Sequence, residues 1–215
     1  QQLSQLHQQK IIVGDLNDQN LLFTPVTIAP AWVDVDSYQL GGHACPVAMI
    51  PFLDPNLYHV ADFSSREWFS EATDWYAYTV LLVKTLLHVH PYGGAHPQLK
   101  TMRARAEAKV SVLQTAVNYP PNARPLESLS DEILEHLHAI FDKGERRPFP
   151  AQLLQKQADN LVQCTQCGLH YPKMRGHCPA CRVAIPAPAP RHTVWEQAAL
   201  LDGVMRVRGK VPVFL

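Results

Sequence analysis

Two Cys-x-x-Cys pairs, CTQC at residues 164–167 and CPAC at residues 178–181, stand ten residues apart in the chain. Each pair places two thiol groups on one tight turn, and four thiolates complete the tetrahedral shell that Zn²⁺ prefers. A segment this short has too little core to fold without a metal, so metal binding must supply folding free energy. The sequence therefore predicts a structural zinc site whose ligands are Cys164, Cys167, Cys178 and Cys181.

The module around these cysteines, residues 160–184, resembles a zinc ribbon with Gly168 and Pro179 in its two turns. Four cysteines fill the coordination shell and leave no open position for water, which indicates a structural metal. His170 and His177 are alternative ligands, and a redox dithiol is the alternative function, which the doubled spacing disfavours. Such cysteines are typical of a reducing, cytoplasmic compartment. The module is a candidate for recruiting a protein partner.

The charge of the chain is balanced, with 19 Lys and Arg against 19 Asp and Glu in 215 residues. No basic field therefore favours nucleic acid or an anionic membrane surface. The longest apolar stretch, Tyr76 to Val89, contains Lys84 and is too short to span a bilayer, and no signal peptide opens the chain. We expect a soluble cytoplasmic protein with no membrane partner and no clear nucleic-acid partner.

Three short apolar runs, Ile11–Val13, Leu21–Phe23 and Ala31–Val33, lie near the start of the chain. Runs of this length are typical of short strands. Strands hold the polar side chains of the loops between them at fixed positions. We therefore expect the polar residues around these runs to form a defined site.

Asp15, Asn20 and Asp34 separate or follow these runs, and their side chains carry the oxygen atoms that phosphoryl transfer needs. A carboxylate such as Asp15 can orient or deprotonate an attacking hydroxyl, while Asn20 and Asp34 can hold Mg²⁺. Positioning and charge neutralisation supply most of the catalysis in this reaction class. The alternative is that Asp15 and Asn20 only form turns, because both residue types hydrogen-bond to nearby backbone.

The run DLNDQNLL at residues 15–22, followed by Asp34, resembles the catalytic loop and the metal-binding aspartate of eukaryotic-type protein kinases. The resemblance implies that Asp15 is the catalytic base and that Asn20 and Asp34 hold the Mg²⁺ that accompanies ATP. Asp36 stands at the glycine position of the family's Asp-Phe-Gly. It is either an accessory metal ligand or a salt-bridged bystander, and we favour the ligand.

Some positions depart from the protein-kinase pattern. Val13 and Gly14 precede the aspartate where the family has His-Arg, and Gly-Asp resembles aminoglycoside and choline kinases instead. Asn17 stands where protein kinases place a lysine. These departures keep two alternatives open, a pseudokinase that serves as a binding scaffold and a small-molecule phosphotransferase.

Later landmarks follow in the order that this family has them. The triplet at residues 54–56, Asp-Pro-Asn, falls where kinases have Ala-Pro-Glu, and the resemblance implies a hydrogen bond between Asn56 and Arg147. Asp74 lies in the first turn of a long apolar helix that Ser70 or Thr73 caps. The resemblance implies that the Asp74 carboxylate bonds to the backbone of the catalytic loop.

Other helices are predicted from apolar spacing and caps. They precede Ile11, extend over Lys100–Val117, follow Ser130 and cover Ala151–Gln157. The charges within Lys100–Val117 are predicted to form a solvated face, with docking of an acidic partner as the alternative. We expect His7 to be a surface or capping residue and Cys45 to be a small buried one.

These features together predict an α+β protein of four parts. A mainly helical, kinase-like C-terminal lobe over residues 1–157 precedes the zinc ribbon, a proline-rich linker over residues 185–191 and the start of a β-rich segment over residues 192–215. No glycine-rich phosphate loop or strand lysine precedes Asp15, so we expect a fragment that lacks the N-terminal lobe. The predicted function is that of a bacterial-type serine/threonine protein kinase, inactive as the isolated fragment, which transfers phosphate from ATP to protein substrates.

Overall fold

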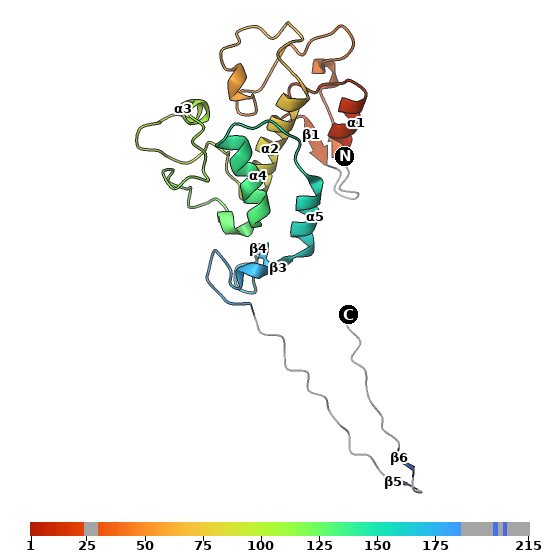
Figure 1. Cartoon of the computed structure of the whole chain (residues 1–215), viewed down its shortest axis with the longest axis vertical. Helices are drawn as coiled ribbons and strands as arrows, with labels where there is room; N and C mark the ends of the chain where they lie inside the picture. Colours follow the sequence, from red (N-terminus) through yellow and green to blue (C-terminus); the bar gives the residue numbers. More distant parts are fainter. Residues whose placement is uncertain (24–29, 186–199, 202–203, 206–215) are drawn as a thin grey trace. The chain divides into compact units, whose positions relative to one another are not determined.

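The structure is a computed structural model that describes residues 1–23, 30–185, 200–201 and 204–205 (Figure 1). Contacts between residues divide the chain into two units, Gln1–Ile185 and Pro186–Leu215. The first unit contains five α-helices and two small antiparallel sheets among its described residues. The predicted α+β class is confirmed at this level.

The helices of the first unit are α1 (Gln2–Gln8), α2 (Glu71–Leu87), α3 (Met102–Glu107), α4 (Asp131–Phe141) and α5 (Ala151–Asp159). The strands are β1 (Leu21–Phe23), β2 (Pro30–Trp32), β3 (Leu161–Gln163) and β4 (His170–Pro172). Short 3₁₀ helices cover Val35–Ser37, Pro55–Leu57, Leu126–Ser128 and Lys173–Arg175.

Helix α2 is the central element of the core, as its apolar sequence predicts. Val80, Val83 and Leu87 are at most 2% exposed and belong to one apolar cluster with residues of α4. Figure 1 shows α4 beside α2, and the ring of Phe141 on α4 makes an edge contact with Tyr76 on α2. Burial of these side chains supplies most of the driving force for folding.

Helix α4 begins and ends where its sequence predicts. Ser130 precedes the helix, and its hydroxyl accepts a hydrogen bond from the backbone N–H of Ile133. Asp131 and Glu132 occupy the first turn, where the helix dipole favours negative charge. The apolar stripe predicted for this helix consists of Ile133, Leu134, Leu137 and Ile140. Three of these residues are at most 1% exposed, and Leu134 is half-buried.

The helix predicted over Lys100–Val117 is much shorter in the structure. Only α3 is helical there, and Lys109 adopts a positive φ of 55° just after it. The predicted solvated charges are exposed except for Arg105, which is 5% exposed. Its guanidinium donates to the carbonyls of Tyr92 and Leu99, because a buried charge needs such partners.

Strands β1 and β2 form an antiparallel hairpin in which Leu21 pairs with Trp32. The backbone N–H of Val33 extends this pairing to the carbonyl of Asn20 at 3.1 Å. Two of the three predicted strands are therefore present. The third predicted run, Ile11–Val13, forms only an isolated bridge between Ile12 and Gln39.

In the second unit the structure describes only β5 (Leu200–Leu201) and β6 (Val204–Met205), which pair antiparallel. The predicted linker at residues 185–191 lies outside the described residues except for Ile185. Most of the predicted β-rich segment, residues 192–215, lies outside them as well.

Candidate functional site

The carboxylate of Asp15 is held on both sides. One oxygen, Oδ1, accepts the backbone N–H of Met49 at 2.7 Å, which joins the loop to a segment 34 residues further along. The other oxygen, Oδ2, accepts the side-chain amide of Asn20 at 3.3 Å, and the same amide donates to the backbone carbonyl of Asp15. The structure therefore brings Asp15 and Asn20 into direct contact.

Asn17 organises the loop between these two residues. Its side chain is 1% exposed, donates to the carbonyl of Asp15 at 3.0 Å and accepts the backbone N–H groups of Gln19 and Asn20. Such local side-chain bonds are the turn chemistry that asparagine favours. The turn interpretation was stated for Asp15 and Asn20, and Asn20 does bond to the backbone carbonyl of Asp15. Asn17, which that interpretation did not include, makes most of the bonds that shape the turn.

Asp34 lies next to this loop through the hairpin, because Val33 pairs with Asn20. It has a positive φ of 60° and an exposed side chain. A hydrogen bond with the carboxyl of Asp36 raises the pKa of Asp34, with smaller contributions from burial and from the charges of Asp36 and Asp15. Negative charge therefore gathers here, as it must where a cation is to be bound.

The candidate oxygen ligands are neighbours but do not form a closed cluster. Asp15 contacts Asn20, Asp34 contacts Asp36, and one backbone hydrogen bond joins the two pairs. Within the described part of the chain, the only group of three or more acidic, histidine or cysteine side chains with all ligand atoms within 4.8 Å is the four cysteines.

Asp74, on helix α2, holds the backbone that leads into Asp15. It is 0% exposed, and its two oxygens accept the backbone N–H groups of Gly14 and Val13, each at 2.8 Å. Nε2 of His7 lies 2.9 Å from Oδ2 of the same carboxylate, so the ring donates its proton there. Charge-assisted hydrogen bonds of this kind are stronger than neutral ones. They fix the backbone just before Asp15.

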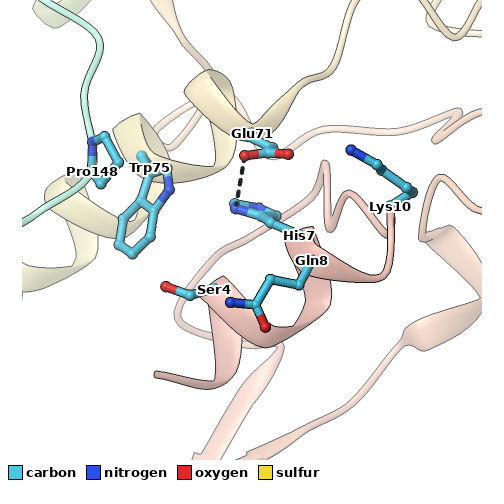
Figure 2. Close-up of a pocket in the computed structure, with 7 residues that line it drawn as sticks. All are labelled: Ser4, His7, Gln8, Lys10, Glu71, Trp75 and Pro148. Atoms are coloured by element: carbon cyan, nitrogen blue, oxygen red, sulfur yellow. Dashed lines mark ion pairs between the residues drawn. The ribbon is translucent and has the colours of Figure 1, made fainter.

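His7 is not the surface residue that the sequence suggested, because it is only 4% exposed. His7 lines a pocket of about 380 Å³, and Figure 2 shows it between Glu71 and Gln8 among the lining residues. Its Nδ1 lies 3.9 Å from Glu71, and the pocket is also lined by Lys10 and Trp75. The sequence carried no signal for this contact, since His7 and Asp74 are 67 residues apart.

The predicted pair of Asn56 and Arg147 is wrong. The structure instead pairs Asp54, two positions before Asn56, with Arg146, one position before Arg147. The guanidinium of Arg146 binds the carboxylate of Asp54 with two hydrogen bonds, of 2.5 and 2.7 Å. Asn56 is exposed, while Arg147 pairs with Glu145 at 3.3 Å. An Asp–Arg pair is fully ionic, so the tether is stronger than the one predicted.

The four predicted cysteine ligands do come together. The Sγ atoms of Cys164 and Cys181 are 3.4 Å apart, and those of Cys167 and Cys178 are 3.6 Å apart. The donor set is all thiol, which fits a soft metal ion such as Zn²⁺. The backbone N–H of Cys167 is the largest of the causes that lower the pKa of Cys164 to about 6. At Cys181 the N–H of Val183 lowers the pKa, but burial and hydrogen bonds with the other three cysteines outweigh it and raise the pKa to about 12. Metal binding would therefore release a proton from such a thiol.

Both cysteine pairs lie on turns with the same backbone hydrogen bonds. The N–H of Gly168 bonds to the carbonyl of Cys164, and the N–H of Arg182 bonds to the carbonyl of Cys178, each at 2.9 Å. Gly168 and Arg182 both have positive φ, of 73° and 63°. The repeated turn aims the two thiols of each pair at one centre.

Comparisons with known proteins give no match that would identify this site. No protein-family model matches the chain, and no curated protein matches it. Across the part of the chain that the structure describes, no helix has the length and apolar character to cross a bilayer.

Proposed function

We propose that this chain carries the catalytic loop of an ATP-dependent phosphotransferase that acts on protein serine or threonine hydroxyls. The observation that supports this most is the contact between Asp15 and Asn20 in a loop whose backbone the buried Asp74 fixes. The resemblance of residues 15–22 and Asp34 to the protein-kinase pattern supplies the reaction class.

In this proposal Asp15 orients the attacking hydroxyl and accepts its proton. Each oxygen of Asp15 accepts one hydrogen bond, Oδ1 from the N–H of Met49 and Oδ2 from the amide of Asn20. A carboxylate oxygen has two lone pairs, so each oxygen keeps one acceptor site for a substrate hydroxyl. The amide nitrogen of Asn20 bonds to Asp15, and its amide oxygen accepts no hydrogen bond from the residues that the structure describes, so this oxygen can serve as a metal ligand. One side chain thus aims the base and holds the cation.

Mg²⁺ bound with ATP would neutralise charge on the transferred phosphate. Asn20 and Asp34 would hold it, and Asp36 would be an accessory ligand. The neighbouring carboxylates of Asp34, Asp36 and Asp15 support this role, because their negative charges would attract a divalent cation.

The test is transfer of label from γ-labelled ATP by the full-length protein in the presence of Mg²⁺, with proteins and with amino-sugars or choline offered in parallel. We expect label on serine or threonine, reduced at least 100-fold by Asp15→Asn. Asp62→Asn, which removes an exposed carboxylate outside the loop, is the matched control. Label found only on a small metabolite would make the chain a small-molecule phosphotransferase.

The scaffold alternative is motivated by the departures from the kinase pattern before Asp15, at Asn17 and at Asn56. The side chain of Asn17 shapes the loop and carries no positive charge towards a phosphate. Binding of Mg²⁺-ATP separates the scaffold from the enzyme. If the full-length protein does not bind Mg²⁺-ATP and Asp34→Asn changes nothing, the chain is a binding module and the transferase proposal fails.

For the cysteine cluster we propose structural Zn²⁺. Metal analysis of the purified protein should give one zinc per chain, and Cys178→Ser, which removes a fully buried thiol, should abolish it. Iron in place of zinc, or two disulfides without metal, would contradict this assignment.

A further inference from the structure

The loop between the two cysteine pairs reaches the start of helix α4. Nη2 of Arg175 donates to the backbone carbonyl of Leu129 at 2.9 Å and to the carboxylate of Asp131 at 2.6 Å. Its Nε donates to the carbonyl of Glu127 at 3.3 Å. One guanidinium thus binds the turn that leads into α4 and the first residue of that helix.

A second contact ties the same loop to the end of α5. The backbone N–H of Lys173 donates to the carbonyl of Asn160, the residue that follows α5, at 2.9 Å. The helix ends themselves are joined, because the side chain of Gln157 on α5 accepts the N–H of Ser130 before α4. The loop therefore binds both helices where they meet.

The other end of this stretch lies in the metal site. Tyr171 is 2% exposed and packs in one cluster with the buried Cys164 and Cys178. Only three residues separate Tyr171 from Arg175, so the metal cluster and the contact with α4 share one short piece of backbone.

We propose that the metal module is an intramolecular clasp whose partner is the start of this chain's own helix α4. Metal binding to the four thiols and docking of Arg175 form one coupled equilibrium. The face that Arg175 occupies is thereby committed to α4 and does not recruit an external protein.

Metal binding and docking of Arg175 are coupled because the metal fixes the shape of the loop that carries Arg175. The apolar cluster of the module is small, so its fold depends on the metal. Without metal the loop loses its fixed shape, and the carbonyls of Glu127 and Leu129 lose a charged donor. Leu129 is 1% exposed, so its backbone lies where an unmade hydrogen bond is costly. Loss of metal therefore destabilises the helical body, by which we mean residues 1–159.

The chain offers a reporter that separates body from module. Residues 160–185 contain no tryptophan, whereas Trp32, Trp68 and Trp75 lie in the body. In a Trp195→Phe background the fluorescence change on heating reports unfolding of the body alone. A chelator should lower this midpoint by about 5 °C, because metal that binds only the folded state stabilises it.

Arg175→Ala should lower the midpoint without chelator and should shrink the further shift that the chelator causes. Coupling between two sites is reciprocal, so the same variant should bind zinc about 10-fold more weakly in competition with a coloured chelator. Lys173→Ala removes a neighbouring exposed positive charge but leaves the backbone donor, and both values should stay as in wild type.

An independent module would give the opposite results. The body would melt at one temperature with or without metal, and Arg175→Ala would bind zinc with wild-type affinity. If Arg175→Ala does not fold, Arg175→Lys serves in its place, because it keeps the charge and loses the two-pronged donor. None of these measurements involves phosphoryl transfer, so the clasp stands or fails apart from the proposed function.

Discussion

Arg146 binds Asp54 through two hydrogen bonds across 92 residues of sequence. The side chain of Asp54 is 3% exposed and that of Arg146 is 16% exposed, so water screens the pair weakly. The guanidinium also lies over the ring of Tyr76 at 4.5 Å, on the central helix α2. This pair joins the segment before the 3₁₀ helix Pro55–Leu57 to the connection between α4 and α5.

Asp54→Asn should destabilise the protein by about 3 kcal/mol, because it leaves the Arg146 charge buried without its counter-ion. Urea unfolding measures this directly. Glu145→Gln removes the neighbouring pair with Arg147, whose side chains are 45% and 47% exposed. That control should change stability by less than about 1 kcal/mol; equal losses in both variants would contradict our account of the buried pair.

Gly14→Ala should disrupt the loop before Asp15. Gly14 has a φ of 72°, and an added Cβ would lie 2.5 Å from Sγ of Cys45, a fully buried side chain. We expect a loss of at least about 2 kcal/mol in thermal or urea unfolding, from strain and overpacking together.

Gly41→Ala is the matched control for this change. Gly41 also has a positive φ, of 58°, but nothing lies within 4 Å of its added Cβ. Only the backbone cost of about 1 kcal/mol should remain. Equal effects at the two glycines would show that the contact with Cys45 has no importance.

Asp74→Asn should loosen the catalytic-loop backbone. The neutral amide keeps only one acceptor oxygen, so one of the two N–H groups of Val13 and Gly14 loses its acceptor and the other keeps an uncharged one. Hydrogen exchange at these two amides should accelerate more than 10-fold, since a hydrogen bond to a charged group contributes about 1.5–3 kcal/mol. Glu71→Gln, at an exposed carboxylate 3.9 Å from His7, should leave both amides protected.

His90 should make stability depend on pH. Its Nδ1 accepts the N–H of Tyr92, so Nε2 carries the proton and donates to the carbonyl of Pro51 at 2.7 Å. Burial is the main cause that lowers the pKa of His90 to about 4, below its ordinary 6.5. The folded state therefore binds fewer protons than the unfolded state, and this stability is lost as the pH falls from 6.5 towards 4.

Because the pKa of His90 falls from 6.5 to about 4, the free energy of unfolding should decrease by about 3 kcal/mol between pH 7 and pH 4. Urea unfolding at pH 7 and pH 4 should show it in wild type and much less in His90→Gln. His43→Gln, at an exposed histidine, should behave as wild type. An ordinary NMR titration of His90 near pH 6.5 would refute the prediction.

Features that depend on neighbouring residues were predictable. The apolar stripe and the Ser130 cap specify α4 within its own residues, and the doubled cysteine spacing specifies a four-thiol cluster. The proximity of Asp15 and Asn20 is also local, because one turn shaped by Asn17 brings them together.

Contacts between distant segments were not predictable in the same way. His7 and Arg175 have the flanking sequence of ordinary surface residues, yet one is bound to Asp74 and the other to the start of α4. A side chain's polarity shows that it needs a partner but does not show which one, since that depends on how helices pack. The pairing of Arg146 in place of Arg147 has the same origin, because adjacent arginines differ only in the direction that the folded backbone gives them.

The sequence by itself determined the cysteine cluster, the main helices and the residues of the candidate phosphotransfer loop, because each depends on spacing over a few residues. The resemblance also implied that Asp74 bonds to the backbone of that loop, and this is confirmed. The tertiary structure alone decided that His7 binds Asp74, that Arg146 binds Asp54 and that the metal module rests on α4. These contacts form only when packing of the apolar core brings distant segments together, and no local pattern encodes that geometry.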